Sequence, residues 1–557
     1  MKVIRSSDNL KQHVRFINTL IIFAVLFFAS RGAAQDQSSR KDTVSMPRLE
    51  IPEITIVGKK AITLPFARKG EIYDTEIFEA PLPDTSLIEE RTGPAFPLGT
   101  LPRYEESFVP FHLSAQGSFG SFATAHARIF ADYKKQNWGL YGNGELKISN
   151  GHVDGADEKS VDLNFKAHAL VKTDNAILGS FRTLGGLKFY HDSYGLYGIK
   201  SSSVDRSRTA VNFSAGLQSI ERESGSLDLN LSALIWSVKD IYPSTDSSSS
   251  TVSPEFDAIY WISLGKFNLN TELHYQSSSL NYNYPVQTPS LLNILIGAQW
   301  NLTPVWKLDV GGSFNQGNNS NGGSNTLVRP YVSLQWQMDR DRQWSVWFIP
   351  EMNIDSYNDL MNSNPYLMRQ IVINPEERSV NLGSRFWYNS ELYTVEVKGT
   401  ALVSSNKPVQ VSKLEIVDLT YVNTEQFIFD LNGIVYPSEK IQIHVSGILQ
   451  PSYERGKAIQ LPMIPLVKMG AKGEIALNYP VTLWSGVEFW SKQNATLNGE
   501  TKLKERLLLS AGASTTVIPR TFLSLEISNI FNRKYEWWSG YTAPGISFLL
   551  DAKFNIR

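Results

Sequence analysis

Apolar and polar residues alternate along most of this chain, from about Phe111 to its end. Every second residue is apolar in residues 122–133, 161–172, 227–235 and 546–556, and most of the residues between them are polar. In residues 161–172, for example, one face carries Val161, Leu163, Phe165, Ala167, Ala169 and Val171. A period of two is the signature of a β-strand with one apolar face, so this region is predicted to be all-β.

The length of these strands separates two kinds of β protein. A soluble sandwich or propeller uses strands of about five or six residues, whereas a tilted strand that crosses a membrane needs about 9–11. At roughly 20 residues per strand and turn, the 446 residues from 112 to 557 supply about 22 strands. We therefore predict a large transmembrane antiparallel β-barrel of about 22 strands over residues 111–557.

The predicted connections fall into a short set and a long set. The connections over residues 134–137 and 301–304 are short. The long, polar connections are residues 150–160, 242–254, 316–325 and 356–365. Short turns on one side and long loops on the other are typical of an outer-membrane barrel. The serine run Ser247–Ser250 and the Asn/Gly run 318–323 are predicted to be loop tips.

The N-terminus predicts export from the cytoplasm. Lys2, Arg5, Lys11 and Arg15 precede an apolar stretch, residues 16–29, that is too short for a spanning helix. Small residues follow, so residues 1–34 are predicted to be a signal peptide cleaved before Gln35. A retained membrane anchor is the alternative.

Residues 35–110 differ from the rest of the chain because they are rich in proline. Nine of the 26 prolines lie between Pro47 and Pro110. Proline at this density is incompatible with central strands and long helices. We expect a short periplasmic segment or a vestigial plug here.

Composition limits the partners and the chemistry. The net charge of −1 is spread along the chain, so no nucleic acid is expected, and the absence of cysteine excludes disulfides and thiolate metal sites. The eight histidines are scattered, and no nucleophile elbow or P-loop occurs. The acidic loop at Asp154, Asp157 and Glu158 fits no EF-hand spacing. We predict no enzyme, no metal site and no cofactor, with a catalytic set assembled across strands as a minor alternative.

The aromatic residues and the size of the barrel bear on its function. The chain has 13 Trp and 23 Tyr, many near predicted strand ends, where girdles at the membrane interface are favoured over a substrate-stacking platform. A barrel of about 22 strands is too wide to be filled by its own wall side chains. Its lumen is therefore either closed by another element or open to solutes.

The C-terminal hundred residues resemble a known family. Residues 522–535 end in the pattern Asn529, Phe531, Asn532 and Tyr535, and the pair Pro544-Gly545 precedes the last strand with its Phe554. Asn at these positions suits a turn, and Pro-Gly can start a strand. This arrangement resembles the end of TonB-dependent outer-membrane receptors, as residues 117–122 resemble their first barrel strand.

The resemblance implies a location, partners and a mechanism. It implies the outer membrane of a Gram-negative cell, with lipid around the barrel. In that family the TonB protein pulls an N-terminal box by adding a strand to it, and a plug then rearranges to admit a ligand. The stretch Glu53, Ile54, Thr55, Ile56 and Val57 resembles such a box; a docking strand is the alternative.

The chain departs from the family pattern in two places. Only 52 residues separate Gly58 from Phe111, which is too few for a full plug, and the chain ends on Arg557 rather than on an aromatic residue. Three functions stay open. The barrel takes up a ligand with a reduced plug or one encoded separately; or it is a plugless passive channel; or it is a scaffold for a periplasmic partner or a surface lipoprotein.

Overall fold

The computed structural model describes residues 111–556, apart from 174–179, 200–203, 221–224, 244–245, 282–286, 321, 414–415, 478–479 and 517. The helix is α4 (Tyr357–Ser363). The strands are β1 (Phe111–Gly120), β2 (Thr124–Lys135), β3 (Trp138–Ser149), β4 (Glu158–Val171), β5 (Phe181–Gly195), β6 (Asp205–Ser219), β7 (Gly225–Ile241), β8 (Asp246–Leu264), β9 (Phe267–Ser277), β10 (Ser279–Asn281), β11 (Ser290–Thr303), β12 (Trp306–Asn318), β13 (Ser324–Gln337), β14 (Arg342–Phe348), β15 (Glu351–Asn353), β16 (Glu376–Asn389), β17 (Tyr393–Lys413), β18 (Ile416–Ser438), β19 (Ile441–Leu449), β20 (Ser452–Glu454), β21 (Val467–Ala476), β22 (Val481–Trp490), β23 (Gln493–Asn494), β24 (Lys502–Leu503), β25 (Arg506–Thr515), β26 (Thr521–Ser528), β27 (Glu536–Trp538), β28 (Tyr541–Thr542) and β29 (Ser547–Asn555).

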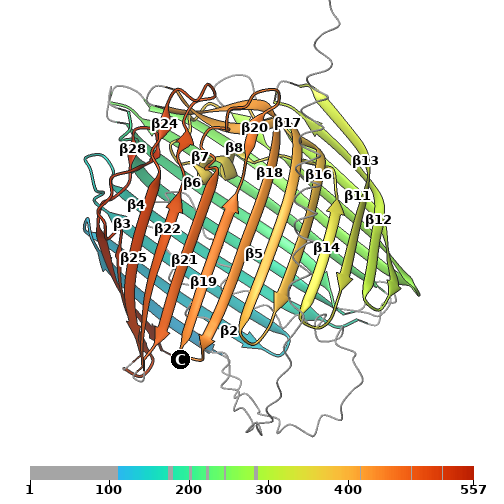
Figure 1. The fold of residues 1–557 in the computed structure, drawn as a ribbon, viewed down its shortest axis with the longest axis horizontal. Coiled ribbons are helices and arrows are strands. Elements are labelled where there is room, and N and C mark those ends of the chain that lie inside the picture. The colour runs from blue at the N-terminus through green and yellow to red at the C-terminus, as the bar shows by residue number, and fades with distance from the viewer. Residues whose placement is uncertain are drawn as a thin grey trace, which may run out of the picture. The chain divides into compact units, whose positions relative to one another are not determined.

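The strands form one antiparallel sheet that closes on itself (Figure 1). Each strand of the wall pairs with its neighbour in the chain, and β1 pairs with β29 to complete the ring. The short strands β10, β15 and β20 continue β9, β14 and β19, because each pair shares one neighbouring strand. The barrel therefore has 22 strands, which confirms the predicted fold class and number.

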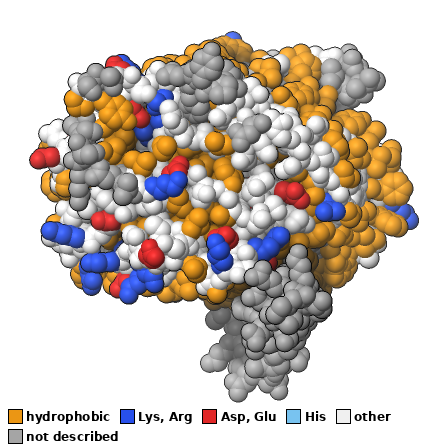
Figure 2. All heavy atoms as spheres, turned by 90° about the horizontal axis from the view of Figure 1, so that it is seen from above, with side chains coloured by type: hydrophobic (Ala, Val, Ile, Leu, Met, Phe, Trp, Pro, Cys, Tyr) orange, Lys and Arg blue, Asp and Glu red, His pale blue; other side chains and the backbone are white. Residues whose placement is uncertain are grey.

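The two faces of the wall differ as the alternation predicted. In β2, Ala125, Ala127 and Ile129 are exposed, whereas Thr124 and His126 on the opposite face are buried. Hydrophobic side chains cover the part of the outer wall visible in Figure 2. Several are more than half exposed around the ring, including Ile129 (61%), Ile296 (60%) and Val328 (64%). An exposed apolar belt around a closed barrel is the face that such proteins turn to lipid.

The two ends of the barrel have different connections. At one end hairpin turns are short, as between Lys135 and Trp138 or between Thr303 and Trp306. We call this the short-turn end, and the opposite end the long-connection end. Phe111 pairs with Tyr133, close to a short turn, so the chain enters the barrel at the short-turn end.

One of the two predicted loop tips is wrong and the other is confirmed. The serine run Ser247–Ser250 lies within β8, where it pairs with β7. The Asn/Gly run 318–323 is a connection as predicted, because residues 319–323 separate β12 from β13. Sequence reasoning missed the strand at the serine run because a serine-rich strand lacks the apolar alternation, which is needed only where a strand faces lipid.

Aromatic residues stand in pairs on neighbouring strands at the short-turn end. Tyr133 lies beside Trp138, and Phe267 beside Trp300, with ring centroids 5.1 and 6.4 Å apart. The rings of Trp306 and Trp336 are stacked with centroids 4.9 Å apart. These positions agree with the predicted girdle at a membrane interface. Within the described part of the chain, no helix is long and apolar enough to span a membrane.

Candidate functional site

The connection between β15 and β16, residues 354–375, folds back into the barrel, and we call it the inner segment. It contains helix α4, which starts at a capping box: the Ser356 hydroxyl accepts from the Asp359 N–H, and the Asp359 carboxylate accepts from the Ser356 N–H. Asn364 and Pro365 follow the helix, where proline prevents its continuation. The spacing of Tyr357, Leu360 and Met361 puts all three on one buried face.

The inner segment builds a hydrophobic core with the barrel wall. This core contains side chains from strands β6, β7, β10, β11 and β13 on one side and from β18 on the other. Trp236 of β7 and Tyr357 of α4 are 1% and 0% exposed, and their rings meet edge to face at 4.5 Å. A core formed in this way ties the segment to distant parts of the ring.

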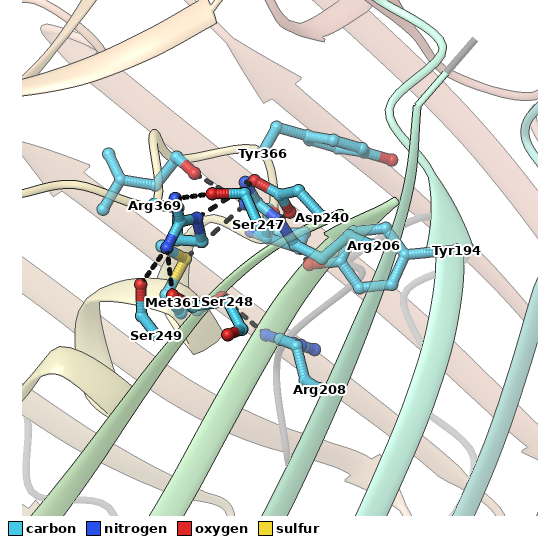
Figure 3. A network of polar contacts seen from close by, with 12 residues as sticks. Tyr194, Arg206, Arg208, Asp240, Ser247, Ser248, Ser249, Met361, Tyr366 and Arg369 are labelled. Atoms are coloured by element: carbon cyan, nitrogen blue, oxygen red, sulfur yellow. Dashed lines mark hydrogen bonds and ion pairs between the residues drawn. The ribbon is translucent and has the colours of Figure 1, made fainter. Parts of the chain in front are cut away.

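Two buried ion pairs of the wall lie against the inner segment, one between β6 and β7 and one between β5 and β6. Figure 3 shows the first of them, between Arg206 and Asp240. Arg206 donates to both oxygens of Asp240, at 2.6 and 3.0 Å, and both side chains are at most 5% exposed. Arg206 also donates to the carbonyls of Pro365 and Leu367 at 2.9 and 2.6 Å. The guanidinium of Arg206 is thus paired with a carboxylate of the wall, and its remaining N–H groups fix the backbone of the inner segment.

Arg208 repeats this arrangement one step further along β6. Its Nε donates to Asp192 Oδ1 at 2.9 Å, and its Nη1 donates to the Met361 carbonyl at the end of α4 at 2.8 Å. Charged groups in a low-dielectric interior are tolerated only when they are paired and hydrogen-bonded, as here.

Arg369 reaches in the opposite direction, from the inner segment to the wall. It donates to the Ser248 carbonyl at 2.6 Å and to the hydroxyls of Ser247 and Ser249 (Figure 3). Its Nε lies 3.7 Å from Asp240, so this carboxylate is shared with Arg206. The serine run therefore serves as an acceptor surface for a buried guanidinium.

Residues 367–374 of the inner segment are attached to β18 by backbone contacts and by a tyrosine hydroxyl. The Met368 N–H donates to the Val417 carbonyl at 2.6 Å, and Leu367 forms a parallel bridge with Val417. The Asn374 N–H donates to the Tyr421 hydroxyl, which donates in turn to the Val372 carbonyl. Since β6 and β18 are far apart around the ring, the inner segment crosses the lumen.

An aromatic cluster joins further connections to the inner segment. Tyr366 stacks on Tyr541 of β28 and contacts Tyr194, Tyr197 and Trp538. In the view onto this end (Figure 2), uncharged polar and hydrophobic atoms fill much of the middle, and charged side chains are scattered over it. The long connections thus pack against one another over the lumen.

Burial changes the ionisation of groups in these connections. It raises the pKa of Tyr197 to about 12 and raises the pKa of Tyr366 well above its ordinary value. Burial, together with the Glu376 and Asp359 carboxylates, also raises the pKa of Asp355. The tyrosines stay protonated and act as neutral packing and hydrogen-bonding groups.

The fold was compared with known proteins. No protein-family model and no curated protein sequence matches the chain. Among solved structures, the FrpB iron transporter from Neisseria meningitidis (F3-3 variant) superposes with a TM-score of 0.65 at 11% identity, over 80% of this chain and 81% of that one. The copper transporter OprC gives 0.63 at 12% identity, over 80% and 81%, and the ferric yersiniabactin uptake receptor FyuA from Yersinia pestis gives 0.61 at 11%, over 80% and 80%.

The chain has the barrel fold of the TonB-dependent receptors. This finding confirms the resemblance that the C-terminal residues carried. A closed barrel of this fold with an apolar outer belt is a protein of the Gram-negative outer membrane.

Residues of the C-terminal pattern of this receptor fold lie together in the connection between β26 and β29. Asn529 and Asn532 both have positive φ, of 50° and 49°. Asn529 donates to the carbonyls of Arg533 and Pro544, and Asn532 accepts from the Ile546 N–H. A Cβ on Gly545 would lie 2.3 Å from Asn532 Oδ1, so a larger residue there would displace the amide oxygen that accepts from the Ile546 N–H.

The other residues of the pattern point in different directions. Tyr535 is 8% exposed and lies near the guanidinium of Arg506, which sits between Trp490 and Trp537. Phe531 and Phe554 are about half exposed, and Phe554 pairs with Ala115 of β1. The pattern thus organises a connection and the seam of the barrel.

The predicted N-terminal features lie outside the described residues. These are the signal peptide 1–34, the proline-rich segment 35–110 and the box residues Glu53, Ile54, Thr55, Ile56 and Val57.

Sequence reasoning missed the inner segment, which was predicted only as a long loop at 356–365. The capping box at Ser356 and Asp359 was a readable signal for the helix. The prediction of no metal site also overlooked one group: Glu255 and Asp257 of β8 and His274 of β9 come together through strand pairing. Residues on different strands have no fixed spacing in sequence, so no motif could reveal them.

Proposed function

We propose that this barrel takes up a ligand across the outer membrane and that the inner segment keeps the entrance closed at rest. The observation that carries this proposal is the path of residues 354–375 across the lumen, with buried arginine contacts at one side and backbone contacts at the other. The fold supports it, because the structures it resembles include an iron transporter, a copper transporter and a ferric yersiniabactin uptake receptor.

A permanently open channel is less well supported than a gated one. A passive pore needs at most a narrowing of its lumen, whereas here the segment reaches from β6 to β18 and lies against two buried ion pairs, which cost desolvation energy to form. A segment that must be displaced and then return benefits from a defined, fully hydrogen-bonded resting position.

Conductance across a planar bilayer tests the proposal. We would compare the intact protein with a variant in which residues 357–363 are replaced by seven Gly and Ser residues, with a deletion of residues 36–110, and with both changes together. We expect low steady conductance from the intact protein and a several-fold increase in the combined variant. A large steady conductance from the intact protein would contradict a closed resting state.

We further propose that residues Glu53–Val57 bind TonB and that energy for opening arrives at the short-turn end. This is supported by the position of Phe111, which connects residues 1–110 to the barrel at that end. Deleting residues 52–58 should abolish crosslinking to TonB and ligand uptake, whereas deleting residues 84–90 should leave the crosslink intact. If uptake and crosslinking survive the first deletion, the box assignment is wrong.

A reduced N-terminal segment leaves room for a second protein in the resting complex. We propose a separately encoded plug or a surface lipoprotein as that partner. Purification from native membranes should then yield a stoichiometric companion of the barrel; recovery of the barrel alone would argue that residues 35–110 and the inner segment suffice.

A further inference from the structure

Strand pairing places two carboxylates and an imidazole on the lumen face of β8 and β9. Glu255 and Asp257 are two residues apart on β8 and share one face, and Asp257 lies opposite His274 on β9. Ser253 on the same face is buried, whereas Val252 and Tyr260 on the other face are exposed toward the lipid side. The three side chains therefore line the lumen.

Their ligand atoms converge on one point. His274 Nδ1 lies 2.6 Å from Asp257 Oδ1 and 3.9 Å from Glu255 Oε1, and all three atoms lie within 4.8 Å of one another. Atoms that share one transition-metal ion at about 2.0–2.2 Å are themselves roughly 3–3.5 Å apart, so only small side-chain rotations are needed.

The two carboxylates at this place have no lysine or arginine ion-pair partner among the described residues, unlike Glu145 and Asp240. Glu145 pairs with Arg128, and Asp240 with Arg206. Among the residues that the structure describes, the only ion-pair partner of Glu255 and Asp257 is His274. The Ser232 hydroxyl donates to Glu255 Oε2 at 3.3 Å, which orients the carboxylate and leaves its other oxygen facing His274.

The donor set selects a class of cation. One imidazole nitrogen with two carboxylate oxygens suits divalent ions such as Zn²⁺, Mn²⁺ or Fe²⁺, whereas Ca²⁺ and Mg²⁺ prefer oxygen alone and Cu⁺ prefers sulfur. Three protein ligands leave positions for water, and the side chains are 32–42% exposed, so ions can exchange with the lumen.

We propose that Glu255, Asp257 and His274 form an exchangeable binding site for a divalent transition-metal cation in the lumen wall. The site lies six residues beyond Ser249, the residue that holds Arg369, or roughly 20 Å along β8 toward the short-turn end. A cation that reaches it from outside must first pass the inner segment. The site itself belongs to the wall, so it exists whether or not the segment gates transport.

Metal binding to the purified full-length protein in detergent tests this site without any transport assay. Titration with Mn²⁺ followed by electron paramagnetic resonance, and with Zn²⁺ by calorimetry, should show one saturable site. His274→Gln, and separately the double change Glu255→Gln with Asp257→Asn, should weaken binding by more than about tenfold, because even outer-shell changes cost that much. Lowering the pH from 7.5 to 5.5 should also weaken it, since the imidazole must be deprotonated to bind.

His126 offers a matched control. Its Nε2 lies 2.9 Å from Glu145 Oε1, but Arg128 already neutralises that carboxylate. His126→Gln should therefore leave metal affinity unchanged.

Thermal unfolding separates a metal site from a purely structural hydrogen bond. Zn²⁺ should raise the unfolding temperature of the wild type and of His126→Gln, but not that of His274→Gln. The proposal is overturned if wild type and His274→Gln bind Mn²⁺ alike, or if neither binds below millimolar concentration. Such a result would leave the gating proposal intact, because the conductance measurements do not depend on metal.

Discussion

At the short-turn end the aromatic side chains stand in pairs on neighbouring strands and face outward, with Trp138 37% and Trp300 48% exposed. At the long-connection end the same residue types turn inward: Trp236, Tyr357 and Tyr541 are at most 1% exposed and build cores between connections far apart in sequence. One end uses aromatic residues to position the barrel in a membrane, and the other uses them to cover the lumen. Residue type alone does not distinguish these roles; long-range packing does.

The largest effect is expected from removing a buried charge at the long-connection end. Arg206→Ala leaves the Asp240 carboxylate buried and takes hydrogen bonds from Pro365 and Leu367. We expect the free energy of unfolding, measured with urea in detergent, to fall by about 3–5 kcal/mol. The buried Asp240 carboxylate loses both hydrogen bonds from Arg206 and keeps only the Arg369 Nε at 3.7 Å, which is costly for a buried charge.

Arg385→Ala is the control for that change, because Arg385 forms an exposed pair with Glu396 on neighbouring strands. Loss of this ion pair should lower the free energy of unfolding by less than about 1 kcal/mol. Equal effects of the two changes would mean that the inner segment is not held by Arg206.

The next prediction compares one residue type at the two ends. Trp236→Ala should destabilise by about 3–5 kcal/mol, since it opens a cavity beneath α4. Trp300→Ala, at an exposed position beside Phe267, should cost on the order of 1 kcal/mol. Thermal unfolding followed by gel mobility measures both, and a larger effect at Trp300 would reverse the assignment of core and girdle.

A smaller effect is expected in the connection between β26 and β29. Asn529→Ala loses three hydrogen bonds and places alanine at a φ of 50°. We expect about 2 kcal/mol of destabilisation. Asn529→Gly keeps the backbone conformation accessible and should cost less; if alanine and glycine behave alike, backbone strain plays no part.

The smallest effect concerns the stacked pair Trp306 and Trp336 at the short-turn end. A double-mutant cycle with alanine should give a coupling of about 0.5–1.5 kcal/mol, as for other aromatic pairs. Coupling near zero would show that each ring is anchored by lipid rather than by its partner.

The sequence predicted the parts of the fold that lipid determines. The wall strands that contact lipid alternate visibly, so their number, the barrel class and the turn at Lys135 and Trp138 could be read directly. The strand over Ser247–Ser250 could not be predicted, because its serines accept hydrogen bonds from Arg369, which lies about 120 residues away in sequence. The inner segment and the Glu255–Asp257–His274 group likewise depend on contacts between residues that only folding brings close. No pattern within a single strand encodes such contacts.

The seam between β1 and β29 has a consequence for how the protein is made. The Ser118 hydroxyl donates to Asp551 at 2.6 Å, although the two residues are 433 positions apart. Contacts this distant form late, because the intervening chain must be ordered first. Until β29 arrives, the growing sheet presents two unpaired edges that can recruit other chains. Biogenesis therefore exposes this barrel to aggregation for as long as its last nine-residue strand is missing, and a chain cut before Ser547 would stay in that state.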